Sequence, residues 1–156
     1  MVPRLFPVLV AALLVAGCGT ETPPQVTFAA GQASVVASPT QYCDLKFTDC
    51  TNNAAAPVAL SVPPGTSLQV KVPPEIAETP WQVVFTYRDA ASAQADGRSP
   101  VFGVGERSDY ALELPDPTDR LLTAQVQQYG PPPQANAETG EIEFTIRASW
   151  VLTTTP

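Results

Sequence analysis

The chain has 156 residues, of which 15 are acidic and 8 basic, and its formal net charge is −7 at pH 7. This length suits one domain and is too short for two ordinary ones. The negative charge disfavours binding to nucleic acid. The chain contains no histidine, which excludes a Ser-His-Asp triad, Cys-His activation and a His-ligated catalytic zinc. We therefore predict a protein that is not an enzyme and that holds no metal and no cofactor.

The first eighteen residues have the pattern of a secretion signal. Arg4 is followed by an apolar run of 13 residues over 5–17, and Cys18 comes directly after it. Such a run fits a signal peptide and is shorter than the roughly 18 residues that a membrane-spanning helix needs. The quartet Val15-Ala16-Gly17-Cys18 resembles a bacterial lipobox. By that resemblance, cleavage after Gly17 would leave Cys18 as the mature N-terminus, carrying palmitate and other acyl chains at the extracytoplasmic face of the cell membrane.

We expect three parts: a lipoprotein signal peptide (1–17), a lipidated cysteine with its tether (18–24) and one domain (25–156). Without residues 1–17 the chain has 139 residues, 7 basic and 15 acidic, with a formal charge of −8. The tether reaches at most roughly 20 Å, so the domain would lie near the membrane. Because an acidic surface repels anionic headgroups, the acyl chains would supply the adhesion.

Alternation of apolar and polar residues, interrupted by Pro, Gly and Asp, predicts strands with one buried face. In the third predicted strand, Cys43, Leu45 and Phe47 share a face. In the last, Ile142, Phe144 and the residues at every second position up to Leu152 face the core. The only predicted helical turn is at residues 74–78, because 18 prolines leave helices little room. In chain order the strands are expected at residues 26–28, 35–36, 42–47, 68–72, 81–88, 110–114, 121–129 and 142–152.

These strands predict an all-β fold, an antiparallel immunoglobulin-like β-sandwich of about seven to nine strands. Trp81 opens its strand at a place where immunoglobulin-like domains often bury a tryptophan. The chain has no cysteine pair that would bridge the two sheets, so the likeness is one of architecture. A partly closed β-barrel is the alternative.

Two cysteines remain if Cys18 carries lipid. Cys43 and Cys50 would then lie in an oxidising compartment, where a disulfide is the natural state of such a pair. The alternatives are redox catalysis and metal binding. Six residues separate the two cysteines, which is not the Cys-x-x-Cys spacing of redox sites, and no histidine completes a zinc site. We therefore predict a structural disulfide.

Two long connections, residues 89–107 and 129–140, are predicted as loops. Loops on a rigid sandwich often carry binding residues, so Phe102, Arg107 and Tyr129 are candidate contacts with a protein or glycan partner in the cell envelope. Glu141 and Glu143 would lie roughly 7 Å apart on one strand face, near the separation found in inverting glycosidases. They face water, however, so a carboxylate-dependent hydrolase is only a remote alternative.

Several short motifs resemble a known family. They are Pro39-Thr40-Gln41-Tyr42-Cys43-Asp44 with Asp49-Cys50, Val62-Pro63-Pro64-Gly65, and the run from Val72-Pro73-Pro74-Glu75 to Trp81-Gln82-Val83-Val84-Phe85. Together with the lipobox they are similar to an uncharacterised family of actinobacterial cell-envelope lipoproteins. The resemblance implies a cell-envelope setting and assigns no functional residue.

The sequence as a whole therefore predicts a membrane-anchored, non-enzymatic binding module. A carrier of a small hydrophobic or lipid ligand is the alternative, and it would need a cavity between the sheets.

Overall fold

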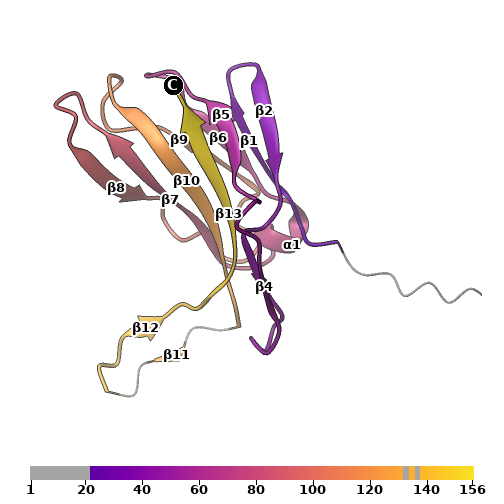
Figure 1. Cartoon of the computed structure of the whole chain (residues 1–156). Helices are drawn as coiled ribbons and strands as arrows, with labels where there is room; N and C mark the ends of the chain where they lie inside the picture. The colour runs from indigo at the N-terminus through magenta and orange to yellow at the C-terminus, as the bar shows by residue number, and fades with distance from the viewer. Residues whose placement is uncertain (1–21, 132–133, 136–137) are drawn as a thin grey trace, which may run out of the picture.

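The computed structural model describes residues 22–131, 134–135 and 138–156, so the predicted signal peptide and Cys18 lie outside the described part. Two β-sheets pack face to face, and a short ribbon projects from one end (Figure 1). The elements in chain order are β1 (Val26–Ala30), β2 (Ala33–Ala37), β3 (Gln41–Cys43), β4 (Cys50–Asn52), β5 (Val58–Ser61), β6 (Leu68–Lys71), α1 (Pro74–Ala77), β7 (Trp81–Arg88), β8 (Gln94–Arg98), β9 (Asp109–Leu112), β10 (Arg120–Tyr129), β11 (Gln134–Ala135), β12 (Ile142–Glu143) and β13 (Ile146–Thr155).

The smaller sheet has four strands in the order β2-β1-β6-β9, and the larger has seven. Six of these seven follow the order β4-β3-β13-β10-β7-β8, and β5 pairs with the second half of β13. That pairing is parallel, whereas the others in the two sheets are antiparallel. The predicted β-sandwich is confirmed, with more strands than expected, and the described strands form no closed barrel.

The core lies between the two sheets and is filled by large side chains. Trp81 of β7, Trp150 of β13 and Phe28 of β1 are all fully buried. They come from strands whose alternation was clear in the sequence, because every second residue of such a strand points to the same side. The period-two prediction is confirmed for β1, in which burial alternates along the strand. In β7 and β13 the tryptophans are buried as predicted, but Gln82 and Ser149, which were expected to face water, are buried as well.

The helical turn α1 is also confirmed, and one buried amide holds it against the larger sheet. Gln128 of β10 is 1% exposed. Its Nε2 donates hydrogen bonds to the Glu75 carbonyl and to Thr79 Oγ1, both at 3.0 Å. A polar residue on a core-facing position of β10 thus fixes the end of the sandwich where α1 lies.

The predicted strand over residues 42–47 was wrong beyond Cys43. Residues 44–49 form a turn instead, in which Leu45 is 64% exposed and Phe47 has a positive φ of 56°. Asp44 directs the turn, since its carboxylate accepts hydrogen bonds from the Thr48 backbone N–H and hydroxyl, each at 2.7 Å. The hydroxyl bond in particular holds the pKa of Asp44 below its usual value. Side-chain bonding to nearby backbone competes with strand pairing.

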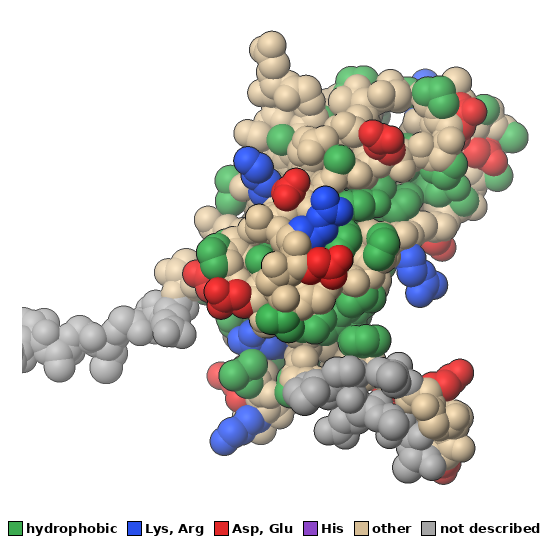
Figure 2. All heavy atoms as spheres, turned by 180° about the vertical axis from the view of Figure 1, so that it is seen from behind, with side chains coloured by type: hydrophobic (Ala, Val, Ile, Leu, Met, Phe, Trp, Pro, Cys, Tyr) green, Lys and Arg blue, Asp and Glu red, His purple; other side chains and the backbone are tan. Residues whose placement is uncertain are grey.

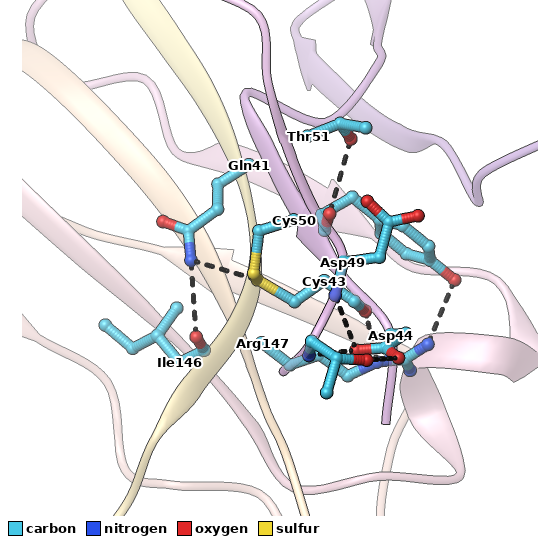
Figure 3. The surroundings of a disulfide bond; sticks show 10 residues. Gln41, Cys43, Asp44, Asp49, Cys50, Thr51, Ile146 and Arg147 are labelled. Carbon is cyan, nitrogen blue, oxygen red and sulfur yellow. Dashed lines mark hydrogen bonds between the residues drawn. A yellow bond between two sulfur atoms is a disulfide. The ribbon is translucent and has the colours of Figure 1, made fainter. Parts of the chain in front are cut away.

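The disulfide between Cys43 and Cys50 is confirmed. The two residues face each other in the β3–β4 pair, with their Cα atoms 4.0 Å apart (Figure 3). Arg147 of β13 donates from Nε to the Cys43 carbonyl at 2.9 Å, so the hairpin is also bound to the larger sheet. The bond closes the turn of residues 44–49.

Replacing both cysteines, Cys43→Ser with Cys50→Ser, is expected to lower the free energy of unfolding by about 2–3 kcal/mol, because the short closed loop restricts the unfolded chain. Urea unfolding followed by circular dichroism measures the change. Reduced wild-type protein serves as the control and should lose a similar amount. Equal stability of the oxidised wild type and the double variant would contradict the prediction.

The predicted last strand is interrupted. Instead of one strand over residues 142–152, β12 ends at Glu143 and β13 begins at Ile146. The β10–β13 register shifts between Gln128 and Tyr129, and such a bulge bends a strand pair. Beyond it, β12 leaves the sheet and pairs with β11 in the ribbon of Figure 1. Phe144 is consequently 43% exposed rather than part of the core.

The predicted loop over residues 89–107 contains a further strand, β8, which pairs with β7. Its sequence, Gln-Ala-Asp-Gly-Arg, lacks apolar alternation. The pairing works because Phe85 of β7 lies over Gly97, where an added Cβ would be 2.3 Å from the ring atom Cζ. This contact was not visible in the sequence, since it depends on a residue on another strand.

Candidate functional site: a groove at one end of the sandwich

Two of the three residues predicted as partner contacts are buried. Phe102 is 3% exposed and Tyr129 is 7% exposed, so neither side chain is available to a partner. Arg107 is exposed. The expectation of a contact surface around Phe102 and Tyr129 was therefore wrong as to these side chains.

Phe102 belongs to an aromatic cluster that fastens its connection to the core. Its ring centroid lies 4.7 Å from that of Trp81 and 5.4 Å from that of Tyr110. The Arg107 guanidinium lies 5.3 Å above the Phe102 ring, and the Arg107 carbonyl accepts a hydrogen bond from Trp81 Nε1 at 3.1 Å. These contacts give residues 102–107 a structural role.

Tyr129 is held in a buried polar cluster. Its hydroxyl accepts a hydrogen bond from Gln82 Nε2 and donates to Gln127 Oε1 at 3.4 Å. Burial raises the pKa of the Tyr129 phenol above its usual value. Tyr129 therefore remains protonated at neutral pH and bonds within the sheet.

The predicted carboxylate pair lies away from the core. Glu141 and Glu143 are exposed, and Glu143 belongs to the β11–β12 ribbon rather than to the larger sheet. Over the described ranges, no group of three or more His, Cys, Asp or Glu residues could hold a metal ion. Within the same ranges, no helix is both long and apolar enough to cross a membrane.

A groove of about 370 Å³ opens between the β5–β6 and β9–β10 connections. Its floor contains the buried side chains of Leu68, Leu112 and Leu121. The walls come from the two connections, which approach closely at Gly65 and Pro117: a Cβ added to Gly65, at φ 76°, would lie 3.4 Å from the Pro117 carbonyl oxygen. The complete lining is Val62, Pro63, Gly65, Thr66, Ser67, Leu68, Leu112, Glu113, Leu114, Asp116, Pro117, Asp119 and Leu121.

The sheet topology places this groove at one end of the sandwich, and the N-terminal segment of the chain joins the domain at the other end. Leu68, the first residue of β6, pairs with Leu112, the last residue of β9. Because β1 is antiparallel to β6, it ends at the groove and begins at the other end. There Trp150 Nε1 donates a hydrogen bond to the Pro24 carbonyl at 2.9 Å. Figure 1 shows the described N-terminal end on the side of α1, with β5 and the C-terminus at the opposite end.

Three carboxylates line the groove, and no lysine or arginine does. Glu113 is exposed, whereas Asp119 is 3% exposed. Asp116 Oδ1 accepts hydrogen bonds from the Thr118 hydroxyl at 2.6 Å and from its N–H at 2.8 Å. The hydroxyl bond chiefly, with the N–H bond, lowers the pKa of Asp116 below its usual value. The groove is therefore negative at neutral pH.

The lining combines hydroxyl, carboxylate and apolar side chains. Ser67 and Thr66 line the groove, yet neither histidine nor lysine lines it to activate a hydroxyl nucleophile. A leucine floor with carboxylates on the walls can instead hold a group that combines charge and apolar surface. The groove was not predicted from the sequence, in which Val62-Pro63-Pro64-Gly65 served only as a motif of the family resemblance. The turn-forming run Asp116-Pro117-Thr118-Asp119 was its one local signal.

Comparison with known proteins identifies a family for the chain but no biochemical activity. A family model described as "Protein of unknown function (DUF2771)" matches residues 19–155. No curated protein and no solved structure matches the chain.

Proposed function

We propose that the chain, which belongs to the DUF2771 family, is a lipid-anchored extracytoplasmic lipoprotein that binds a partner in the cell envelope without catalysis. The observation that carries this proposal is the position of the groove. It lies at the end of the sandwich opposite to the entry of the chain at Pro24. A domain attached to the membrane through its N-terminus would thus present the groove away from the bilayer.

Two further features support an anchored, extracytoplasmic setting. The disulfide between Cys43 and Cys50 suits an oxidising compartment. The hydrogen bond from Trp150 to the Pro24 carbonyl fixes the last residue of the predicted tether to the core. Only residues 19–23 then separate a lipidated Cys18 from Pro24, so the domain stays close to the membrane surface.

Binding to a nucleic acid is not part of the proposal. Acidic side chains are interspersed with basic and hydrophobic ones on the face seen in Figure 2, which shows no continuous basic area. A nucleic-acid site would need such an area to meet the phosphates. The carrier alternative receives less support, because the space between the sheets is occupied by fully buried side chains such as Trp81 and Trp150.

Photo-crosslinking in intact cells tests the binding role. A photoreactive amino acid at Ser67, which is half-buried in the groove wall, is expected to form an adduct with an envelope partner. The same amino acid at Ser34, which is exposed on β2 and does not line the groove, is the matched control. Absence of an adduct at Ser67, or the same adducts from both positions, would reject the groove as the binding site.

A further inference from the structure

The groove contains a buried carboxylate with few partners. Asp119 is 3% exposed, and the one side-chain hydrogen bond it makes within the described residues is from the Asp116 N–H to Oδ2, at 3.1 Å. A buried carboxylate is stable only when it is well hydrogen-bonded or paired with a cation. No lysine or arginine lines the groove. The carboxylates of the lining therefore have no cationic side chain beside them in the groove, and a positively charged group from outside would fit their chemistry.

The other lining residues indicate which further groups a positively charged ligand should carry. Glu113 is an exposed second carboxylate on the same wall as Asp119, and Leu114 follows it as a half-buried hydrophobic side chain. Val62 is a half-buried hydrophobic side chain on the opposite wall. A free metal ion or a small inorganic cation would leave this apolar surface exposed to water. A lysine or arginine side chain with an apolar neighbour would cover it, since long basic side chains also bury their methylene stems.

The walls are fixed before any ligand arrives. The Thr118 N–H and hydroxyl bind the Asp116 carboxylate, and the Asp119 carboxylate accepts the Asp116 N–H, so the two ends of this turn hold each other. On the other wall, the Thr66 N–H donates to the Pro63 carbonyl at 3.1 Å. A preformed groove loses little conformational entropy on binding.

From these features we infer that the groove binds a basic segment of a partner protein, with a lysine or arginine side chain directed at Asp119 and Glu113 and an adjacent apolar side chain on the leucine floor. The inference rests on the proposed function and adds the chemical class of the partner. The volume of about 370 Å³ accommodates one or two such side chains rather than a folded domain.

The probe is the peptide acetyl-Leu-Arg-Leu-Arg-Leu-amide, compared with its counterpart in which both arginines are glutamine. The lipidated full protein is placed in phosphatidylcholine nanodiscs, whose neutral lipid does not attract the peptide, and empty nanodiscs are the blank. Titration calorimetry is expected to show binding of the arginine peptide that weakens as salt is raised. The glutamine peptide should bind at least about 10-fold more weakly, because it cannot pair with the carboxylates.

Variants of the protein complete the test. Glu113→Gln and Asp119→Asn should each reduce affinity for the arginine peptide about 10-fold, while Glu75→Gln, exposed on α1 at the opposite end, should leave it unchanged. Glu113 is exposed and its variant tests the inference even if Asp119→Asn unfolds. Equal affinity of both peptides, unchanged affinity in the Glu113→Gln variant, or equally tight binding of free spermidine would overturn the inference. An adduct at Ser67 in cells together with such a result would retain the binding role and reject only the basic partner.

Discussion

The Cys18→Ser variant is expected to leave the membrane fraction almost completely and to appear as soluble or unprocessed protein. The physical reason is that the acyl chains on Cys18 would supply the adhesion. Each buried methylene contributes about 0.8 kcal/mol, and two or more chains give stable anchoring where a single chain does not. The formal charge of the part beyond residue 17, −8, opposes electrostatic attraction to an anionic bilayer. Cell fractionation and detergent-phase partitioning measure the distribution.

A matched control is available within the chain. The Cys43→Ser and Cys50→Ser double variant also loses cysteines, and it removes the disulfide, but it should stay with the membrane because Cys18 is intact. If the Cys18→Ser variant remained membrane-bound at the wild-type level, lipid anchoring through this residue would be rejected. Mass spectrometry of the wild-type N-terminal peptide should show the added acyl mass directly.

Trp150→Ala is expected to lower the free energy of unfolding by about 3–5 kcal/mol, the range for removing a large aromatic side chain from a core. Trp150 is fully buried on the central strand β13, and its Nε1 donates a hydrogen bond to the Pro24 carbonyl. Because domains of this size have about 5–15 kcal/mol of stability, the variant should be largely or partly unfolded at 37 °C. Urea unfolding followed by far-ultraviolet circular dichroism measures the loss.

Two variants separate the contributions at this position. Trp150→Phe keeps most of the ring but leaves the Pro24 carbonyl without its donor, for a loss of about 1–2 kcal/mol. Val36→Ala, at a side chain that is 52% exposed on β2, should change stability by about 0.5 kcal/mol or less. A Trp150→Ala variant within about 1 kcal/mol of the wild type would contradict the assignment of Trp150 to the core.

Strands with one face in the core were predictable from their residues. In β6 and β10, buried side chains alternate with more exposed ones. Each residue on the core side of a strand gains from burial of its own apolar surface, so the pattern can be recognised from the residues of that strand alone. The same holds for the disulfide, because Cys43 and Cys50 lie in one short segment with six residues between them.

Elements whose stability comes from another strand were not predictable in this way. The polar strand β8 exists because Gly97 leaves room for Phe85 of β7, and β5 is placed by its parallel pairing with β13. Residues 44–49 show the opposite case, since the Asp44 carboxylate binds Thr48 and ends a strand that apolar alternation would continue. Hydrogen bonds of this kind depend on rotamers and turns, which alternation does not encode.

The sequence by itself determined that this protein has an all-β core, a disulfide between Cys43 and Cys50 and a lipobox-like quartet that predicts an anchor, because each is expressed in neighbouring residues. Only the tertiary structure decided that Phe102 and Tyr129 are buried and that Glu113 and Asp119 share a groove with Leu68. The groove joins connections that are about fifty residues apart in the chain. Their meeting follows from the antiparallel pairing of β6 with β9, and such long-range pairing is decided by the packing of the whole sandwich.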